Sequence, residues 1–158
     1  MRRQAFDWSA FNFEKPGVRD YRLAYIEKTA GEHDLDGYEL DFTRFTWYFP
    51  LGRERSLAHL MTNLVRRVRR SLDDIGGKRG RPYTLAVHVF DSIETSLNLG
   101  LDVETWADEG LVDALVVGTG YLPYVLDLDE WLDLAEPLGI PVYPSFNTNT
   151  IEDWRPFL

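Results

Sequence analysis

The stretch Asp36-Gly37-Tyr38-Glu39-Leu40-Asp41-Phe42-Thr43-Arg44 decides how the chain folds. After the turn dipeptide, apolar residues alternate with polar ones, which is the two-residue period of a β-strand. One face of this strand is apolar, and the other carries the carboxylates of Glu39 and Asp41. The segments on both sides have helical patterns, and helices usually cover the apolar face of such a strand. The acidic face should therefore point toward something polar.

Helical and extended patterns alternate along the rest of the chain. Apolar runs predict three further strands, over Thr84–Phe90, Ala114–Val117 and Ile140–Phe146. Apolar spacings of three and four residues predict helices over Val18–Gly31, Ser56–Leu72, Ser92–Asn98, Asp102–Glu109 and Asp129–Gly139. The glycine-rich stretch Gly76–Pro82 is expected to be a connector. This order predicts an α/β fold of right-handed, parallel βαβ units in a single domain, residues 1–158.

The charge composition of the chain argues against some classes of binding partner. Of its 158 residues, 26 are acidic and 17 basic, and the net charge of −9 argues against nucleic acid or an anionic membrane as a partner. We therefore interpret an arginine cluster, Arg66, Arg67, Arg69 and Arg70, as the solvated face of a helix. The sequence has no recognisable signal peptide or membrane span. A cytoplasmic protein is expected if the sequence is complete, and the compartment stays open if it is a piece of a longer chain.

Sequence motifs for several kinds of chemistry are missing. The chain has no cysteine, which excludes a thiol nucleophile and disulfide bonds. It has no G-x-G-x-x-G turn after a strand, no H-x-H or H-E-x-x-H spacing and no G-x-S-x-G elbow. We therefore expect neither a cofactor nor a metal.

Functional groups of a parallel α/β sheet collect at the carboxyl ends of its strands. The candidate catalytic residues expected there are Glu39, Asp41 and His88. Each has a structural alternative. Asp41 could cap the following loop, and His88 could be a hydrogen-bonded core histidine. Glu39 could form an internal pair with Arg44 or His88. The candidate substrate-binding residues at the same end are Arg44, Trp47, Tyr48, Tyr121, Tyr143 and Asn147.

Two parts of the sequence resemble bacterial glycosyl-hydrolase-like TIM barrels of a family-10-like kind. They are Asp36 to Arg44, and Gly100-Leu101-Asp102-Val103-Glu104-Thr105-Trp106 with Glu109-Gly110-Leu111-Val112-Asp113. The resemblance extends from about Phe6 to Asn147 and implies that the chain holds strands four to seven of an eight-stranded barrel. In related glycosidases the aspartate that ends the fourth strand is the nucleophile, and this role falls on Asp41. The acid of their fifth strand has no counterpart here, where the strand carries His88, and the seventh strand ends in Asn147.

The resemblance implies a glycoside hydrolase-like protein that acts on or binds carbohydrate, with Trp47, Tyr48 and Tyr121 stacking on sugar rings. The alternative is a non-catalytic barrel fragment with a structural, oligomerisation or sugar-binding role. A small-molecule lyase or isomerase on the same scaffold is a third possibility. A full barrel takes about 250 residues, and a half-barrel leaves open sheet edges. Copies of the chain are therefore expected to associate as a homo-oligomer.

Overall fold

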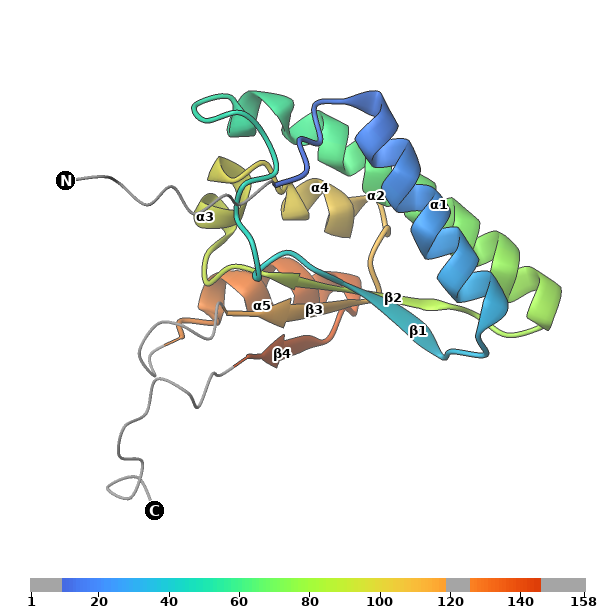
Figure 1. The fold of residues 1–158 in the computed structure, drawn as a ribbon. Coiled ribbons are helices and arrows are strands. Elements are labelled where there is room, and N and C mark those ends of the chain that lie inside the picture. The colour runs from blue at the N-terminus through green and yellow to red at the C-terminus, as the bar shows by residue number, and fades with distance from the viewer. Residues whose placement is uncertain (1–9, 119–125, 146–158) are drawn as a thin grey trace, which may run out of the picture.

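The protein is a sheet of parallel strands with helices between them, as a computed structural model describes it for residues 10–118 and 126–145 (Figure 1). The strands are β1 (Gly37–Asp41), β2 (Thr84–Val89), β3 (Ala114–Val117) and β4 (Val142–Pro144). The helices are α1 (Pro16–Glu32), α2 (Glu54–Arg79), α3 (Ile93–Asn98), α4 (Val103–Asp108) and α5 (Asp129–Ala135), and the 3-10 turn η1 (Glu136–Leu138) follows α5. This confirms the predicted α/β class and the predicted order of elements.

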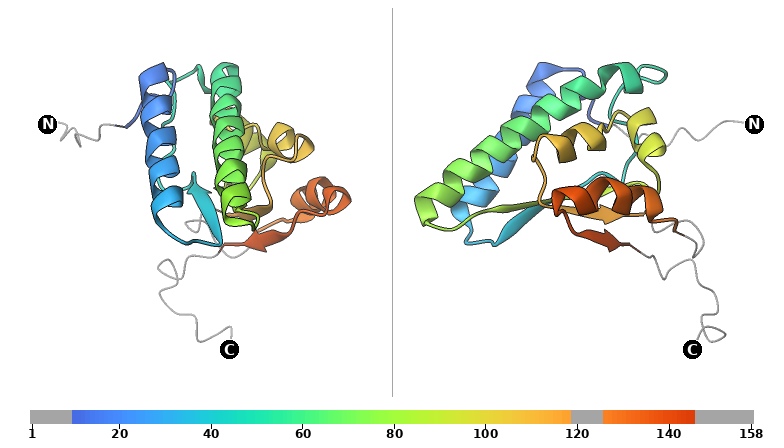
Figure 2. Two further views of the ribbon diagram at one scale, coloured as in Figure 1. Left: turned by 90° about the vertical axis from the view of Figure 1, so that its right-hand side faces the viewer. Right: turned by 180° about the vertical axis from the view of Figure 1, so that it is seen from behind.

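The four strands follow one another in the sheet in the same order as in the chain, β1-β2-β3-β4, and every neighbouring pair is parallel. All the helices lie on one side of this sheet, which the left view of Figure 2 shows along the strands. Consecutive strand order goes with this arrangement, because each crossover returns over the same face. The helix-facing side and the opposite side of the sheet therefore have different environments.

The core lies between the helices and the sheet. The β2 side chains that point toward the helices, Leu85, Val87 and Val89, are completely buried, as are the indole rings of Trp106 and Trp131. Both indoles have hydrogen-bond partners: Trp106 Nε1 donates to Thr62 Oγ1 at 2.9 Å and Trp131 Nε1 to the Asp91 carbonyl at 3.2 Å. A buried indole N–H without an acceptor would destabilise the fold, so these bonds make the two tryptophans suitable core residues.

Helix α2 is longer than the sequence predicts. It begins at Glu54 rather than Ser56 and continues to Arg79 through Gly76 and Gly77, so the expected connector Gly76–Pro82 is wrong for its first half. The helix ends where Gly80 adopts a left-handed conformation, φ = 73°, the usual glycine position after a helix. The remaining turn then leads into β2 at Thr84.

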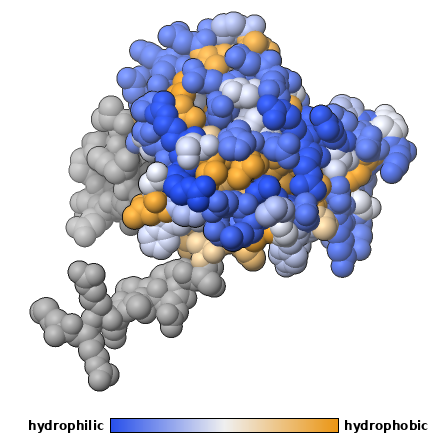
Figure 3. All heavy atoms as spheres, turned by 90° about the horizontal axis from the view of Figure 1, so that it is seen from above, coloured by the Kyte–Doolittle hydropathy of each residue, from blue (hydrophilic) through white to orange (hydrophobic). Residues whose placement is uncertain are grey.

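The arginines of α2 bind carboxylates of neighbouring segments. Arg66 pairs with Glu109 at 2.5 Å, Arg67 with Asp20 at 2.8 Å and Arg69 with Asp113 at 2.7 Å. The helical side of the molecule is largely hydrophilic, with apolar residues in narrow strips (Figure 3). In the described part of the chain, no helix combines the length and apolar character needed to cross a membrane.

Candidate functional site

Side chains that point away from the helices form a row across the sheet. The strand register aligns Asp41 with His88, His88 with Val116 and Val116 with Tyr143. Glu39 lies two residues before Asp41 and is aligned with Ala86. Because side chains of aligned residues in a parallel sheet share a face, the structure places Glu39, Asp41, His88 and Tyr143 together on the side without helices. The row from Asp41 to Tyr143 lies near the carboxyl ends of the strands.

The carboxylate of Asp41 closes a tight turn at the end of β1. Its Oδ1 accepts hydrogen bonds from the Thr43 backbone N–H at 2.7 Å and from the Thr43 hydroxyl at 2.8 Å. This is the loop-capping contact that Asp and Thr commonly make. The side chain is nevertheless 48% exposed, and the described residues give Oδ2 no hydrogen bond. Within the described part of the chain, Asp41 therefore has one oxygen held by Thr43 and one without a hydrogen-bond partner.

The imidazole of His88 lies between the end of β1 and Gly118, the residue after β3. Its Nε2 lies 2.8 Å from the carbonyl of Gly118, which can only accept, so Nε2 carries the proton. Its Nδ1 lies 3.4 Å from Thr43 Oγ1 and 3.6 Å from Asp41 Oδ1. The ring is 15% exposed. This geometry matches the hydrogen-bonded histidine that the sequence left as an alternative, with the Gly118 carbonyl as the acceptor.

Glu39 is exposed and has no acidic or basic neighbour in the strand register. Its aligned partner on β2 is the small residue Ala86, so the carboxylate faces an open part of the sheet. The expected internal pair between Glu39 and His88 is absent from the described residues, in which the imidazole contacts Asp41 and Thr43 instead.

Five of the six candidate substrate-binding residues fall into three groups. Trp47 and Tyr143 are 64% and 56% exposed, so their rings are accessible. The guanidinium of Arg44 lies over the ring of Phe45, 5.7 Å from its centroid. Tyr121 and Asn147 lie outside the described residues.

The structure corrects the prediction that Tyr48 binds substrate. Its side chain is only 7% exposed and packs edge-on against Phe13 and Phe42, with ring centroids 6.1 and 5.7 Å away. The hydroxyl donates to the Phe42 carbonyl, and burial, followed by the negative charge of Asp41, raises the pKa of Tyr48 well above its usual range. A ring held in the core in this way does not suit the stacking of a sugar.

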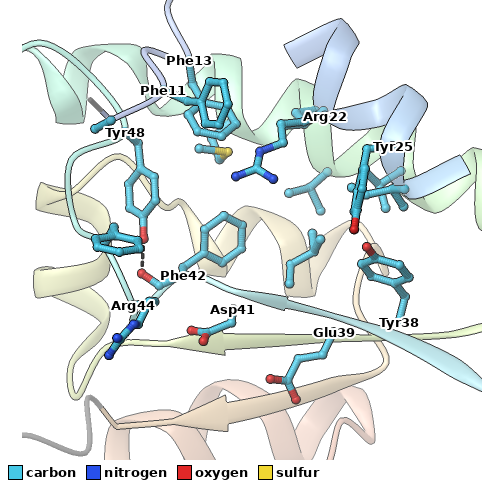
Figure 4. Close-up of a pocket in the computed structure, with 18 of the residues that line it drawn as sticks. Phe11, Phe13, Arg22, Tyr25, Tyr38, Glu39, Asp41, Phe42, Arg44 and Tyr48 are labelled. Carbon is cyan, nitrogen blue, oxygen red and sulfur yellow. Dashed lines mark hydrogen bonds between the residues drawn. The ribbon is translucent and has the colours of Figure 1, made fainter. Parts of the chain in front are cut away.

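A cavity of about 410 Å³ lies on the other side of β1, between this strand and helices α1 and α2 (Figure 4). Its walls are mainly aromatic and aliphatic, and the guanidinium of Arg22 points into it. Backbone and side chains of β1 line the cavity, but Figure 4 shows the carboxylates of Glu39 and Asp41 pointing away from it, across the strand. The sequence analysis missed this cavity. The only available signal was the unusual number of aromatic residues before Pro16 and after Phe42.

The described residues do not form a metal-binding site. No three His, Asp or Glu side chains lie close enough together in that part of the chain to bind an ion. The expectation of no metal stays a prediction for the whole chain. Comparison with known proteins found no match to the chain, either among protein families or among curated proteins.

Proposed function

We propose that the protein is a glycoside hydrolase-like barrel fragment that holds carbohydrate on the helix-free face of its sheet, with Asp41 in contact with the sugar. The observation that carries this proposal is the row Asp41–His88–Val116–Tyr143, which combines a half-exposed carboxylate and an exposed aromatic ring near the carboxyl ends of parallel strands. The consecutive strand order and the one-sided helix layer support the half-barrel part of the proposal.

The row has the chemistry and the length for an oligosaccharide. Three strand spacings separate Asp41 from Tyr143, about 14 Å at roughly 4.8 Å for each spacing. A carboxylate oxygen accepts hydrogen bonds from sugar hydroxyls, and the exposed ring of Tyr143 offers an apolar face to a pyranose ring. Two hydrogen bonds from Thr43 hold Asp41 in place, which reduces the entropy lost when a ligand binds.

Hydrolysis is the stronger form of this proposal. Glycosidases use two carboxyl groups, about 5 to 9.5 Å apart, as nucleophile or base and as acid. The Oδ2 of Asp41, which the described residues leave without a hydrogen bond, suits one of these roles, but the residues aligned with Asp41 across the sheet, His88, Val116 and Tyr143, are not acidic. This observation favours the second candidate, a non-catalytic fragment that binds sugar without cleaving it.

The test compares Asp41→Asn with Asp133→Asn. The amide keeps Oδ1 as an acceptor for Thr43, so Asp41→Asn should retain the fold, and the exposed Asp133 of α5 provides the same chemical change on the helical side. Binding is measured by calorimetry against a panel of soluble oligosaccharides, and hydrolysis against a matching panel of chromogenic glycosides. We expect Asp41→Asn to weaken binding at least tenfold, about 1.4 kcal/mol, while Asp133→Asn behaves as the wild type.

Each outcome has a fixed meaning. Cleavage by the wild type that disappears in Asp41→Asn supports hydrolysis, and binding without cleavage supports the non-catalytic candidate. A wild type that binds none of the panel, or an Asp41→Asn variant that binds every sugar as tightly as the wild type does, contradicts the proposal.

A further inference from the structure

The helix-facing side of β1 is covered less completely than that of the neighbouring strand. Tyr38 and Leu40 of β1 are only half-buried, whereas Leu85 and Val87 of β2 are completely buried. Helix α1 packs against α2 rather than closely on β1, which leaves the cavity of about 410 Å³ between these three elements. Pockets for small molecules have volumes of about 300–1,000 Å³, so this cavity is large enough for a small ligand.

Aromatic rings surround the cavity and form its mouth. The rings that line it include those of Phe11, Phe13, Tyr25, Phe42 and Trp47. Phe11, Tyr25 and Trp47 are also exposed to solvent, so a ligand can enter from outside. Buried aliphatic side chains of α2, among them Leu64 and Val68, line its inner side. Flat rings pack well in such surroundings, because aromatic pairs stack with an offset or meet edge-to-face.

A positive charge points into this apolar space. Two arginines line the cavity, and Figure 4 shows the guanidinium of Arg22 pointing into it and that of Arg44 pointing away. The guanidinium carbon of Arg22 lies 4.8 Å from the centroid of the Phe11 ring. Within residues 10–118 and 126–145, this guanidinium has no hydrogen bond and no ion pair, in contrast to that of Arg66, which pairs with Glu109. Its N–H donors are therefore unmatched by the described side chains.

Among the described residues, no carboxylate opposes Arg22 in the cavity. The carboxylates of Glu39 and Asp41 point away from it, across the strand (Figure 4). The hydroxyls of Tyr25 and Tyr38 point toward one another. Burial, followed by the neighbouring phenol of Tyr25, raises the pKa of Tyr38, so the Tyr38 hydroxyl stays neutral. The charge of Arg22 thus favours an anion in the cavity.

We propose that this cavity is a binding site for a small aromatic carboxylate, separate from the face of the sheet proposed above for sugar. The carboxylate binds Arg22, because the planar fork of guanidinium N–H donors matches two carboxylate oxygens. The ring of the ligand packs among the aromatic walls, where Phe13 and Phe42 lie. A sugar fits poorly, because the mainly apolar walls offer few partners for its hydroxyls. An alkyl carboxylate meets the same charge but has no flat face to stack.

Calorimetry with three probes tests the proposal. The probes are naphthoate, its uncharged amide naphthamide, and octanoate, which carries the carboxylate without a ring. The wild type should bind naphthoate at least tenfold more tightly than either of the others. Arg22→Gln removes the charge, so it should weaken the binding of naphthoate at least tenfold and leave that of naphthamide unchanged. The matched control is Arg70→Gln, at an exposed residue of α2 that does not line the cavity, and it should bind naphthoate as the wild type does.

Nuclear magnetic resonance locates the probe in the wild type, independently of any variant. Naphthoate should show nuclear Overhauser effects to the methyl groups of Ile26, Leu64 and Val68, which line the cavity, and none to Val116 on the opposite face of the sheet. Four results overturn the proposal: no binding of naphthoate at millimolar concentration, naphthamide or octanoate bound as tightly as naphthoate, an affinity for naphthoate that Arg22→Gln leaves unchanged, and contacts of the probe with Val116 instead of the cavity.

Discussion

The hydroxyl of Tyr48 makes a buried hydrogen bond whose contribution to the stability of the fold can be measured separately. Tyr48→Phe leaves the Phe42 carbonyl without this donor and should lower the free energy of unfolding by about 1–2 kcal/mol, measured by urea denaturation at neutral pH. Because burial raises the pKa of Tyr48, its stabilising effect is complete below about pH 10 and is lost as the pH rises further. The variant should therefore lose less stability than the wild type above pH 10. Tyr143→Phe, at an exposed ring, is the control, and an equal loss in both variants would contradict this role for Tyr48.

The sequence predicts single residues well where the strand period alone decides their position. It correctly places Glu39, Asp41, His88 and Tyr143 on one face, because alternation within each strand is local. It fails for Tyr48, whose burial depends on the loop after β1 folding back onto Phe13 and Phe42. It also leaves the role of His88 open, because the partners of its ring, Gly118 and Thr43, lie on segments far away in the sequence.

Two adjacent glycines near the end of α2 give a matched pair of substitutions. A Cβ at Gly76 would lie 2.8 Å from the Arg81 carbonyl oxygen, a backbone atom that cannot move away cheaply, so Gly76→Ala should destabilise the protein by about 1–3 kcal/mol. A Cβ at Gly77 would meet nothing within 4 Å, and Gly77→Ala should stabilise the helix by up to about 1 kcal/mol. Thermal unfolding followed by circular dichroism measures both changes. Opposite signs are expected, and destabilisation by both variants would show that the helix does not continue through this stretch.

The same glycines explain why the end of α2 was predicted wrongly. Glycine has a low helix propensity, so two of them in succession indicate a break when the sequence is considered alone. In the structure the close passage of the chain at Arg81 and Tyr83 needs a residue without a side chain at Gly76, and this tertiary contact overrides the local preference. The short helices α3 and α4 were placed correctly because their start signals are local: the Ser92 and Asp102 side chains accept hydrogen bonds from the Thr95 and Thr105 N–H groups.

At the scale of the whole molecule, the sequence predicts the class of fold and the parallel sheet. Apolar runs such as Thr84–Val89 alternate with amphipathic helices, and few other folds accommodate this pattern. The cavity below α1 could not be predicted, because it depends on how far α1 extends past the sheet.

Arginines of α2 and of the turn that follows it pair with carboxylates of distant segments. These pairs predict how the stability of the fold depends on pH. Hydrogen bonds from Arg66, Arg81 and Arg55 lower the pKa of Glu109, Asp34 and Glu94 respectively. A carboxyl with a lowered pKa stabilises the fold above its unfolded pKa, near 4, and loses this effect as the pH falls through the lower folded value. The melting temperature should therefore change little between pH 7 and about 5 and should fall below about pH 4. Because all three carboxylates are exposed, the fall should be shallow, and it should be shallower still in 1 M salt. Calorimetry of the wild type and of Glu109→Gln measures this fall in melting temperature, and the exposed Glu136→Gln is the control. A melting temperature that rises on acidification would contradict the role of these pairs.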